Sequence, residues 1–493
     1  MTSAHETPDP TTPPTPRSLT GTRPPTRTRR RAAAVAGLAC ALTLTAALPV
    51  EAAARGGAIP ASGAGDPYFP FAGNQGYDVE HYDLDLDFAS PVLTAQATLT
   101  ARATADLNEF HLDYSGPAIE EVEVSGRPAD HRREGQELII TPSAPIPAGH
   151  VFTVRVRYRG TPETVDDPQL GAHGWIITDD GAVTLNQPDG ARSWYPVNDD
   201  VRDKATYTFH ITTAADMTAL ANGEPTGPPR VSGDRSTATW VMREPMASYL
   251  SMVAIGDFTR TDGTVGGLPH ITAYDPAGQE TDGELRTVTA EAVQWGQERF
   301  GAYPFDSTGG IIDRVGGGYA LETQSRPVYD GAPDEATIVH EIAHQWFGDS
   351  VTPKTWADIW LNEGFATYAE WLWGESRGGP SAQSVFDEYY ATPADDPFWS
   401  RKTGDPGREH MFDYQTVYLR GAMALHALRT RIGDADFSAL LRAWAEKHRH
   451  GNADTGDLLA LTRSVAGLSE ADAAQWADTW LYTAAKPAEP AAR

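Results

Sequence analysis

The spacing of two histidines and two glutamates most constrains this chain of 493 residues. His340 and His344 are four residues apart, so on a helix their imidazoles lie on one face, one turn apart, and can hold one Zn²⁺. Glu341, next to the first histidine, can hold a water on that metal as a general base. Catalytic zinc takes a third protein ligand, and Glu363, in the sequence Asn-Glu-Gly, follows His344 with eighteen residues between them. We predict one Zn²⁺ per chain, bound by His340, His344 and Glu363.

Helix signals surround both halves of this motif. Pro333, Asp334 and Glu335 suit a first helical turn, because proline is tolerated there and acids lie near the positive end of the helix dipole. Gly348 fits the end of that helix. We expect a second helix from about residue 355 to 373, ended by Gly374.

Composition excludes some functions. The net charge of −28 argues against a nucleic-acid partner, because nucleic-acid binding needs basic surfaces. The length gives room for two or three domains, and 40% hydrophobic residues are enough for their cores. The single cysteine, Cys40, excludes an internal disulfide framework.

The first 54 residues have the pattern of an export signal. Residues 1–31 are rich in Pro and Thr and end in arginines, residues 32–50 form an apolar run, and an Ala-x-Ala cleavage pattern follows at 52–54. We predict a signal peptide at 1–54, a linker at 55–67, and a secreted mature protein without stable membrane association. Pro49 makes a membrane anchor a weaker alternative. A lipoprotein site at Cys40 lacks a suitable residue three places earlier, and the arginine pair at 29–30 lacks the bulky apolar residues of twin-arginine signals.

Apolar and polar residues alternate through much of residues 68–258. Tyr82, Leu84 and Leu86, for example, alternate with aspartates. Strands with one wet face, separated by Gly, Pro and Asp turns, indicate an antiparallel β domain. Beyond Phe258 the apolar spacing becomes helical. We therefore predict an α+β multidomain fold, with the β domain at 68–258, an α-rich zinc catalytic domain at 259–486 and a flexible tail at 487–493.

Two further stretches offer groups that can bind substrate. The glycines at 316–318 permit close backbone approach, and the residues after them suit an extended edge for a peptide. Glu322, an acid in an otherwise uncharged run, can bind a substrate's α-ammonium group, although a solvent-facing strand carboxylate is an equally ordinary explanation. Tyr414 and Tyr418 can each aim a hydroxyl at an oxyanion, and the residues alone do not choose between them.

These motifs resemble the zinc gluzincin aminopeptidases, the aminopeptidase N family that also includes leukotriene hydrolase. The resemblance covers nearly all of residues 68–486 and implies a β-saddle N-terminal domain followed by a thermolysin-like catalytic domain. HEIAH and NEG match the family's zinc signature, which implies ligand roles for His340, His344 and Glu363 and the base role for Glu341.

Two more roles follow from the resemblance. The sequence YLRG at 418–421 matches the family's Y-x-K/R-G pattern, which implies that Tyr418, rather than Tyr414, stabilises the oxyanion. The segment at 184–199 resembles the part of the family's β domain that reaches the active site, and its Gln187 falls at the position that binds the substrate amine. The family's G-x-M-E-N motif reads YALET at 319–323, which keeps the glutamate, Glu322, but not the flanking glycine and asparagine.

The resemblance implies an aminopeptidase that uses zinc-activated water to remove N-terminal residues from peptides with a free N-terminus, and the export signal implies that it is secreted. The alternative is a thermolysin-like zinc endopeptidase, which has no use for an amine anchor such as Glu322. An epoxide hydrolase would need a lipid pocket that nothing in the sequence indicates, and a non-catalytic protein would predict loss of Glu341, Glu363 or Tyr418. The helical C-terminal domain of larger family members has no counterpart in this sequence, so we expect a more open cleft.

Overall fold

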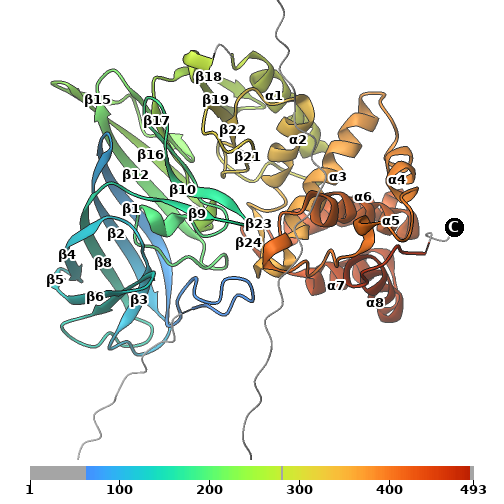
Figure 1. Cartoon of the computed structure of the whole chain (residues 1–493), viewed down its shortest axis with the longest axis horizontal. Coiled ribbons are helices and arrows are strands. Elements are labelled where there is room, and N and C mark those ends of the chain that lie inside the picture. Colours follow the sequence, from blue (N-terminus) through green and yellow to red (C-terminus); the bar gives the residue numbers. More distant parts are fainter. Residues whose placement is uncertain (1–62, 279–280, 489–493) are drawn as a thin grey trace, which may run out of the picture. The chain divides into compact units, whose positions relative to one another are not determined.

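The computed structural model describes residues 63–278 and 281–488 (Figure 1). The predicted signal peptide, most of the predicted linker and residues 489–493 of the predicted tail lie outside these residues. In the described part, no helix combines the length and the apolar character that a bilayer crossing requires.

The alternating stretches form a nine-stranded sheet. In β1, Tyr82, Leu84 and Leu86 are almost completely buried, while the aspartates between them are partly or fully exposed. All but one of the strand pairs in this sheet are antiparallel. The exception is β1 with β12, and the long connection between these two strands allows them to pair in parallel. The strands in order across the sheet are β14 (Glu224–Pro225), β16 (Arg235–Met246), β12 (Ala205–Ala214), β1 (Tyr77–Ala89), β2 (Val92–Ala103), β8 (Val151–Gly160), β4 (Ala118–Val124) and β5 (Arg127–Pro128), with β15 (Arg230–Ser232) beside β16.

Two smaller antiparallel sheets complete the N-terminal β region. Trp175 and Leu185 from one of them are buried in the hydrophobic core. The five-stranded sheet has the order β13 (Thr218–Ala221), β17 (Val253–Gly256), β11 (Ala182–Leu185), β10 (Gly171–Ile177) and β9 (Thr164–Asp167), and the three-stranded sheet has the order β3 (Phe110–Asp113), β7 (Glu137–Thr141) and β6 (Asp130–Glu134).

Beyond Phe258 the strands pair in new sheets and helices dominate (Figure 1). α1 and α2 pack together, and α1 lies against β20. The predicted boundary near residue 258 coincides with this change of strand partners and stays a prediction. The sheets are β18 (Thr259–Val265), β19 (Leu268–Tyr274), β20 (Thr308–Asp313), β22 (Val328–Asp330) and β21 (Ala320–Leu321), then β23 (Val351–Pro353) with β24 (Gly451–Ala453). The helices are α1 (Gly283–Phe300), α2 (Glu335–His344), α3 (Trp360–Ser376), α4 (Ala382–Tyr390), α5 (Arg420–Ile432), α6 (Asp434–Lys447), α7 (Thr455–Ala466) and α8 (Glu470–Ala477).

The zinc motif lies on α2 and α3. The Asp334 side chain accepts a hydrogen bond from the Thr337 amide and so caps α2. The helix begins at Glu335, so Pro333 and Asp334 precede its first turn rather than forming part of it. α3 begins at Trp360 rather than near residue 355, because residues 356–358 form a separate 3₁₀ turn. It also continues past Gly374 to Ser376. The glycine with positive φ at its end is Gly378, at +85°, which suits the conformation that commonly terminates helices.

Two glycines set how closely α3 and α5 approach. A Cβ on Gly364 would lie 2.9 Å from the Cα of Gly421, and a Cβ on Gly421 would lie 2.8 Å from the Cα of Gly364. Only glycine permits this backbone contact. Gly364 directly follows Glu363, and Gly421 lies just after the turn with Tyr418, so this contact brings the two motifs together.

A partly buried lysine ties the N-terminal β region to the helical region. The ammonium of Lys204, just before β12, donates to the carbonyl oxygens of Asp349, Ser350 and Gly451 at 2.9, 3.0 and 3.0 Å. Asp349 and Ser350 follow α2, and Gly451 is the first residue of β24. One side chain therefore donates to three backbone carbonyls, of which that of Asp349 also accepts from the Thr352 hydroxyl at 3.1 Å.

Replacing Lys204 with methionine should destabilise the protein, because methionine fills similar space but donates no hydrogen bond. We expect Lys204→Met to lower the free energy of unfolding by about 2 kcal/mol, since the carbonyls of Ser350 and Gly451 lose this donor and each such loss costs roughly 1 kcal/mol or more. Urea denaturation followed by tryptophan fluorescence measures this. The exposed Lys402→Met variant is the control, and equal midpoints for the two variants would contradict the proposed role of Lys204.

Candidate active site

The three predicted zinc ligands lie close together. The Nε2 atoms of His340 and His344 lie 3.3 and 3.4 Å from the same Oε2 of Glu363, and one ligand atom from each of the three residues lies within 4.8 Å of the others. All three side chains are buried. Ligands about 2.0–2.1 Å from a tetrahedral Zn²⁺ are about 3.3–3.4 Å from one another. The donor set and its spacing therefore fit zinc.

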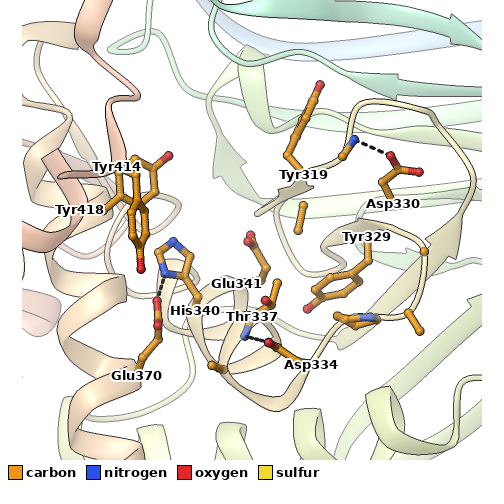
Figure 2. Close-up of a pocket in the computed structure, with 16 residues that line it drawn as sticks. Tyr319, Tyr329, Asp330, Asp334, Thr337, His340, Glu341, Glu370, Tyr414 and Tyr418 are labelled. Carbon is orange, nitrogen blue, oxygen red and sulfur yellow. Dashed lines mark hydrogen bonds and ion pairs between the residues drawn. The ribbon is translucent and has the colours of Figure 1, made fainter. Parts of the chain in front are cut away.

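The outer nitrogens of both histidines are hydrogen-bonded. Nδ1 of His340 lies 2.6 Å from Oε1 of Glu370, a residue of α3 (Figure 2). Nδ1 of His344 lies 3.1 Å from the carbonyl oxygen of Phe347. Because a carbonyl only accepts, Nδ1 of His344 donates to it, which leaves Nε2 on the side of Glu363. Such outer partners orient metal-binding imidazoles.

The role of Glu370 was not predicted from the sequence. It lies seven residues after Glu363 on α3, which is two helical turns, so both carboxylates lie on the same face. This spacing could have indicated the role of Glu370, but the signal is weak because many helices carry acidic pairs seven residues apart.

Buried negative charge gathers around the two imidazoles. Glu322, Glu341 and Glu363 are 2–6% exposed. Burial raises the pKa of Glu341 to about 7 and raises that of Glu322 above its usual value. Burial also acts on Glu363, but the charge of His344 and hydrogen bonds from both histidines outweigh it and lower its pKa to about 2. Glu363 is therefore ionised, and a divalent cation would balance the charge of this group.

Glu322 and Glu341 face the same point from two elements. One ligand atom from each lies within 4.8 Å of His344 and of the other. Nε2 of Gln187 donates to Oε1 of Glu322 at 2.8 Å, so the β region contributes a side chain to the site. Oε2 of Glu341 is buried and has no hydrogen-bond partner among the described residues. An unpartnered carboxylate oxygen suits a group that holds and deprotonates a water.

Gln345 fixes the backbone that carries Glu322, a role that the sequence did not indicate. Its Nε2 donates to the carbonyl of Glu322 at 3.2 Å, and its Oε1 accepts from the amide of Ser325 at 2.7 Å. Ser325 has a φ of +67°, a conformation that serine rarely adopts. The buried guanidinium of Arg326 donates to the carbonyls of Ala221 and Gly223. These bonds hold the turn after Glu322 in a strained but defined shape.

The geometry distinguishes the two candidate tyrosines. Both lie in a single π-helical segment, Tyr414–Leu419, of the kind often found at functional sites. The Tyr418 ring stacks on His340, with 5.9 Å between ring centroids and 16° between planes, whereas Tyr414 is 56% exposed. Burial, followed by the charge of Glu363, raises the pKa of Tyr418 well above 10, so its hydroxyl remains a donor.

A cavity of about 670 Å³ opens beside these groups. Figure 2 shows Tyr319 on one side of it, Tyr414 and Tyr418 on the other, and Glu341 between them. Ala320, at the start of β21, also lines the cavity. Since β21 is the edge strand of its sheet, an extended peptide can lie along it as the glycine-rich sequence predicts.

Removing the outer partner of His340 should weaken zinc binding. We expect Glu370→Ala to lower the zinc affinity by about 10–100-fold, the usual effect of losing such a partner. Competition with a chromogenic chelator measures the affinity. The control is Glu375→Ala, also on α3 but outside the cavity lining. If both variants bind zinc equally tightly, Glu370 does not support the ligand.

Comparisons with known proteins agree with this geometry. The Peptidase M1 N-terminal domain matches residues 78–250, and the Peptidase family M1 domain matches residues 321–480. The chain is 26% identical over 408 residues to probable aminopeptidase 2 of Sulfurisphaera tokodaii, covering 77% of this chain and 50% of that protein. It is 27% identical over 454 residues to aminopeptidase N of Streptomyces lividans, covering 82% and 50%. It thus spans about half the length of the curated relatives it matches.

The solved structures include a relative of similar length. A mutant M1 zinc metallopeptidase from Deinococcus radiodurans, crystallised with a Tyr-Ser-Ala substrate, has a TM-score of 0.78 and 33% identity to this chain. The match covers 87% of this chain and 99% of the other. Together with the two family models and the placement of the zinc motif, this similarity shows that the chain belongs to the M1 family of zinc metallopeptidases.

Proposed function

We propose that this chain is a zinc-dependent aminopeptidase that removes the N-terminal residue from peptides with a free α-amino group. The observation that carries this proposal is the position of Glu322, whose carboxylate lies within 4.8 Å of ligand atoms of Glu341 and His344. An ammonium group bound by Glu322 leaves room for about one residue before the metal, because consecutive Cα atoms are about 3.8 Å apart. The first peptide bond is then the one that reacts.

Different residues contribute to different steps of the reaction. Zinc held by His340, His344 and Glu363 would polarise the scissile carbonyl and make the attacking water more acidic. Glu341 accepts a proton from that water and passes it to the leaving amine.

The other groups position the substrate. Tyr418 donates to the oxyanion that forms on the scissile carbonyl. Glu322, with Gln187 beside it, binds the α-ammonium group through a charge-assisted hydrogen bond. Gln345 acts one step away, because it holds the backbone of Glu322.

The relatives support this choice of substrate. A mutant of the Deinococcus radiodurans enzyme is bound to a Tyr-Ser-Ala substrate, and a mutant of a two-domain M1 zinc metallopeptidase is bound to L-arginine or L-tryptophan. The relatives from Sulfurisphaera tokodaii and Streptomyces lividans are named as aminopeptidases. We also propose, from the signal pattern in residues 1–54, that the mature chain acts after secretion.

Glu341→Gln should keep zinc and fold but lose nearly all turnover, because the amide is similar in shape and cannot accept the proton. We expect kcat to fall by at least about 10²–10⁴-fold, the usual contribution of a general base. Initial rates on aminoacyl chromogenic amides, with zinc content measured in parallel, test this. The control is Glu335→Gln, on the first turn of α2 and outside the cavity lining. A variant that keeps the wild-type kcat would place the base elsewhere.

The substrate's free amine should matter through Glu322. We expect the wild type to trim a free peptide and to cleave the N-acetylated form of the same peptide poorly. Glu322→Ala should lower kcat/KM for the free peptide by about 10-fold or more, because a charge-assisted hydrogen bond contributes roughly 1.5–3 kcal/mol. The acetylated peptide, which lacks the charge, should be unaffected by the substitution.

Mass spectrometry of the products distinguishes the alternative. Internal cleavage of the acetylated peptide, at a rate equal to trimming of the free one, would identify a thermolysin-like endopeptidase and overturn the aminopeptidase proposal.

A further inference from the structure

A second group of metal-ligating side chains lies on the nine-stranded sheet, away from the active site. Asp83 and Asp85 are alternate residues of β1 and therefore project from the same face. His210 on β12 is the register partner of Asp85. Nε2 of His210 lies 3.5 Å from Oδ1 of Asp83, and one ligand atom from each of the three residues lies within 4.8 Å of the others.

The spacing of these atoms resembles that of the active-site ligands. The 3.5 Å separation is close to the 3.3 and 3.4 Å between the imidazoles and Glu363. Ligands of a tetrahedral Zn²⁺ are about 3.3–3.4 Å apart. An imidazole with two carboxylates suits zinc and its first-row neighbours, whereas calcium and magnesium prefer oxygen alone. Small side-chain rotations would complete the set.

The imidazole is already held in an orientation that suits binding. His210 pairs in register with Thr239 on β16, and its Nδ1 is hydrogen-bonded to the Thr239 hydroxyl at 3.1 Å. This leaves Nε2 on the side of the carboxylates. Both active-site histidines show the same arrangement, with Nδ1 bonded outward and Nε2 directed at an acid, which is the usual arrangement of zinc-binding histidines.

Among the described residues, no lysine or arginine forms an ion pair with Asp83 or Asp85. Asp87, the next acid on this face, pairs with Arg235. Arg157, two strands away, is bound by Glu121 and by Gln96. These two arginines are therefore engaged with other partners. Burial raises the pKa of Asp85, the charge of His210 opposes that rise, and the charge of Asp83 adds a smaller increase.

The surface here is also concave. A cavity of about 270 Å³ lies beside the cluster, lined by Asp85, His210 and Arg157 among others, while Asp83 lies outside its lining. An ion bound at the edge of this cavity would have room for the water molecules that complete its coordination.

We propose that His210, Asp83 and Asp85 form a second Zn²⁺ site on the β region. The site binds more weakly than the catalytic one, because the side chains of His210 and Asp83 are 33% and 44% exposed and water competes for them. It is independent of the peptidase proposal, since no residue is shared between the two sites.

Zinc titration of the full chain tests this site. The chain is first loaded with one equivalent of zinc, then titrated against a chromogenic chelator, with thermal unfolding followed in parallel. We expect a second, weaker equivalent in the wild type that raises the unfolding temperature. His210→Ala and Asp85→Asn should each remove the second equivalent and its stabilisation while keeping the first. His131→Ala, at an exposed histidine of β6, should keep both.

Two results would overturn the proposal. One is a wild type that binds no second equivalent. The other is a second equivalent that persists in both His210→Ala and Asp85→Asn. Aminopeptidase activity does not enter either result, so this test and the peptidase tests can fail separately.

Discussion

One carboxylate oxygen shared by two imidazoles is the interaction on which the catalytic region depends. Glu363 can reach His340 and His344 only if α2 and α3 pack side by side. Burying ionisable groups is costly unless they are paired or bind metal. The contact of Gly364 with Gly421 brings α5 to the same place and with it Tyr418. Backbone packing, rather than local sequence, thus assembles the site.

The N-terminal β region is part of this assembly. A single connection, from the end of β11 to the start of β12, carries both Gln187, which touches Glu322, and Lys204, which binds carbonyls after α2 and in β24. Gln187 contacts the carboxylate that we propose binds the substrate amine, and Lys204 holds the backbone. The active site is therefore complete only when the β region is folded against the helices that carry the metal ligands.

Features that depend on residues close together in the sequence could be predicted. Contacts between segments far apart in the sequence were harder to predict. The four-residue spacing of His340 and His344 places both on one helix face, and the two-residue period of β1 predicts its buried side. Gln187 and Glu322 are 135 residues apart, and only the family resemblance suggested that they act together. The pairing of β1 with β12 in parallel, which brings His210 to Asp85, cannot be predicted from alternation, because alternation does not specify a strand's neighbour.

The two turns of α3 between Glu363 and Glu370 have a consequence for how this protein can vary. Each residue added to a helix rotates the rest of that helix by about 100°. A single insertion or deletion between these glutamates would turn one of them away from His340. Glu363 and Glu370 could then no longer contact the same imidazole ring. The six residues between the glutamates, 364–369, are all buried. This segment of the chain is therefore constrained over evolution in length as well as in composition.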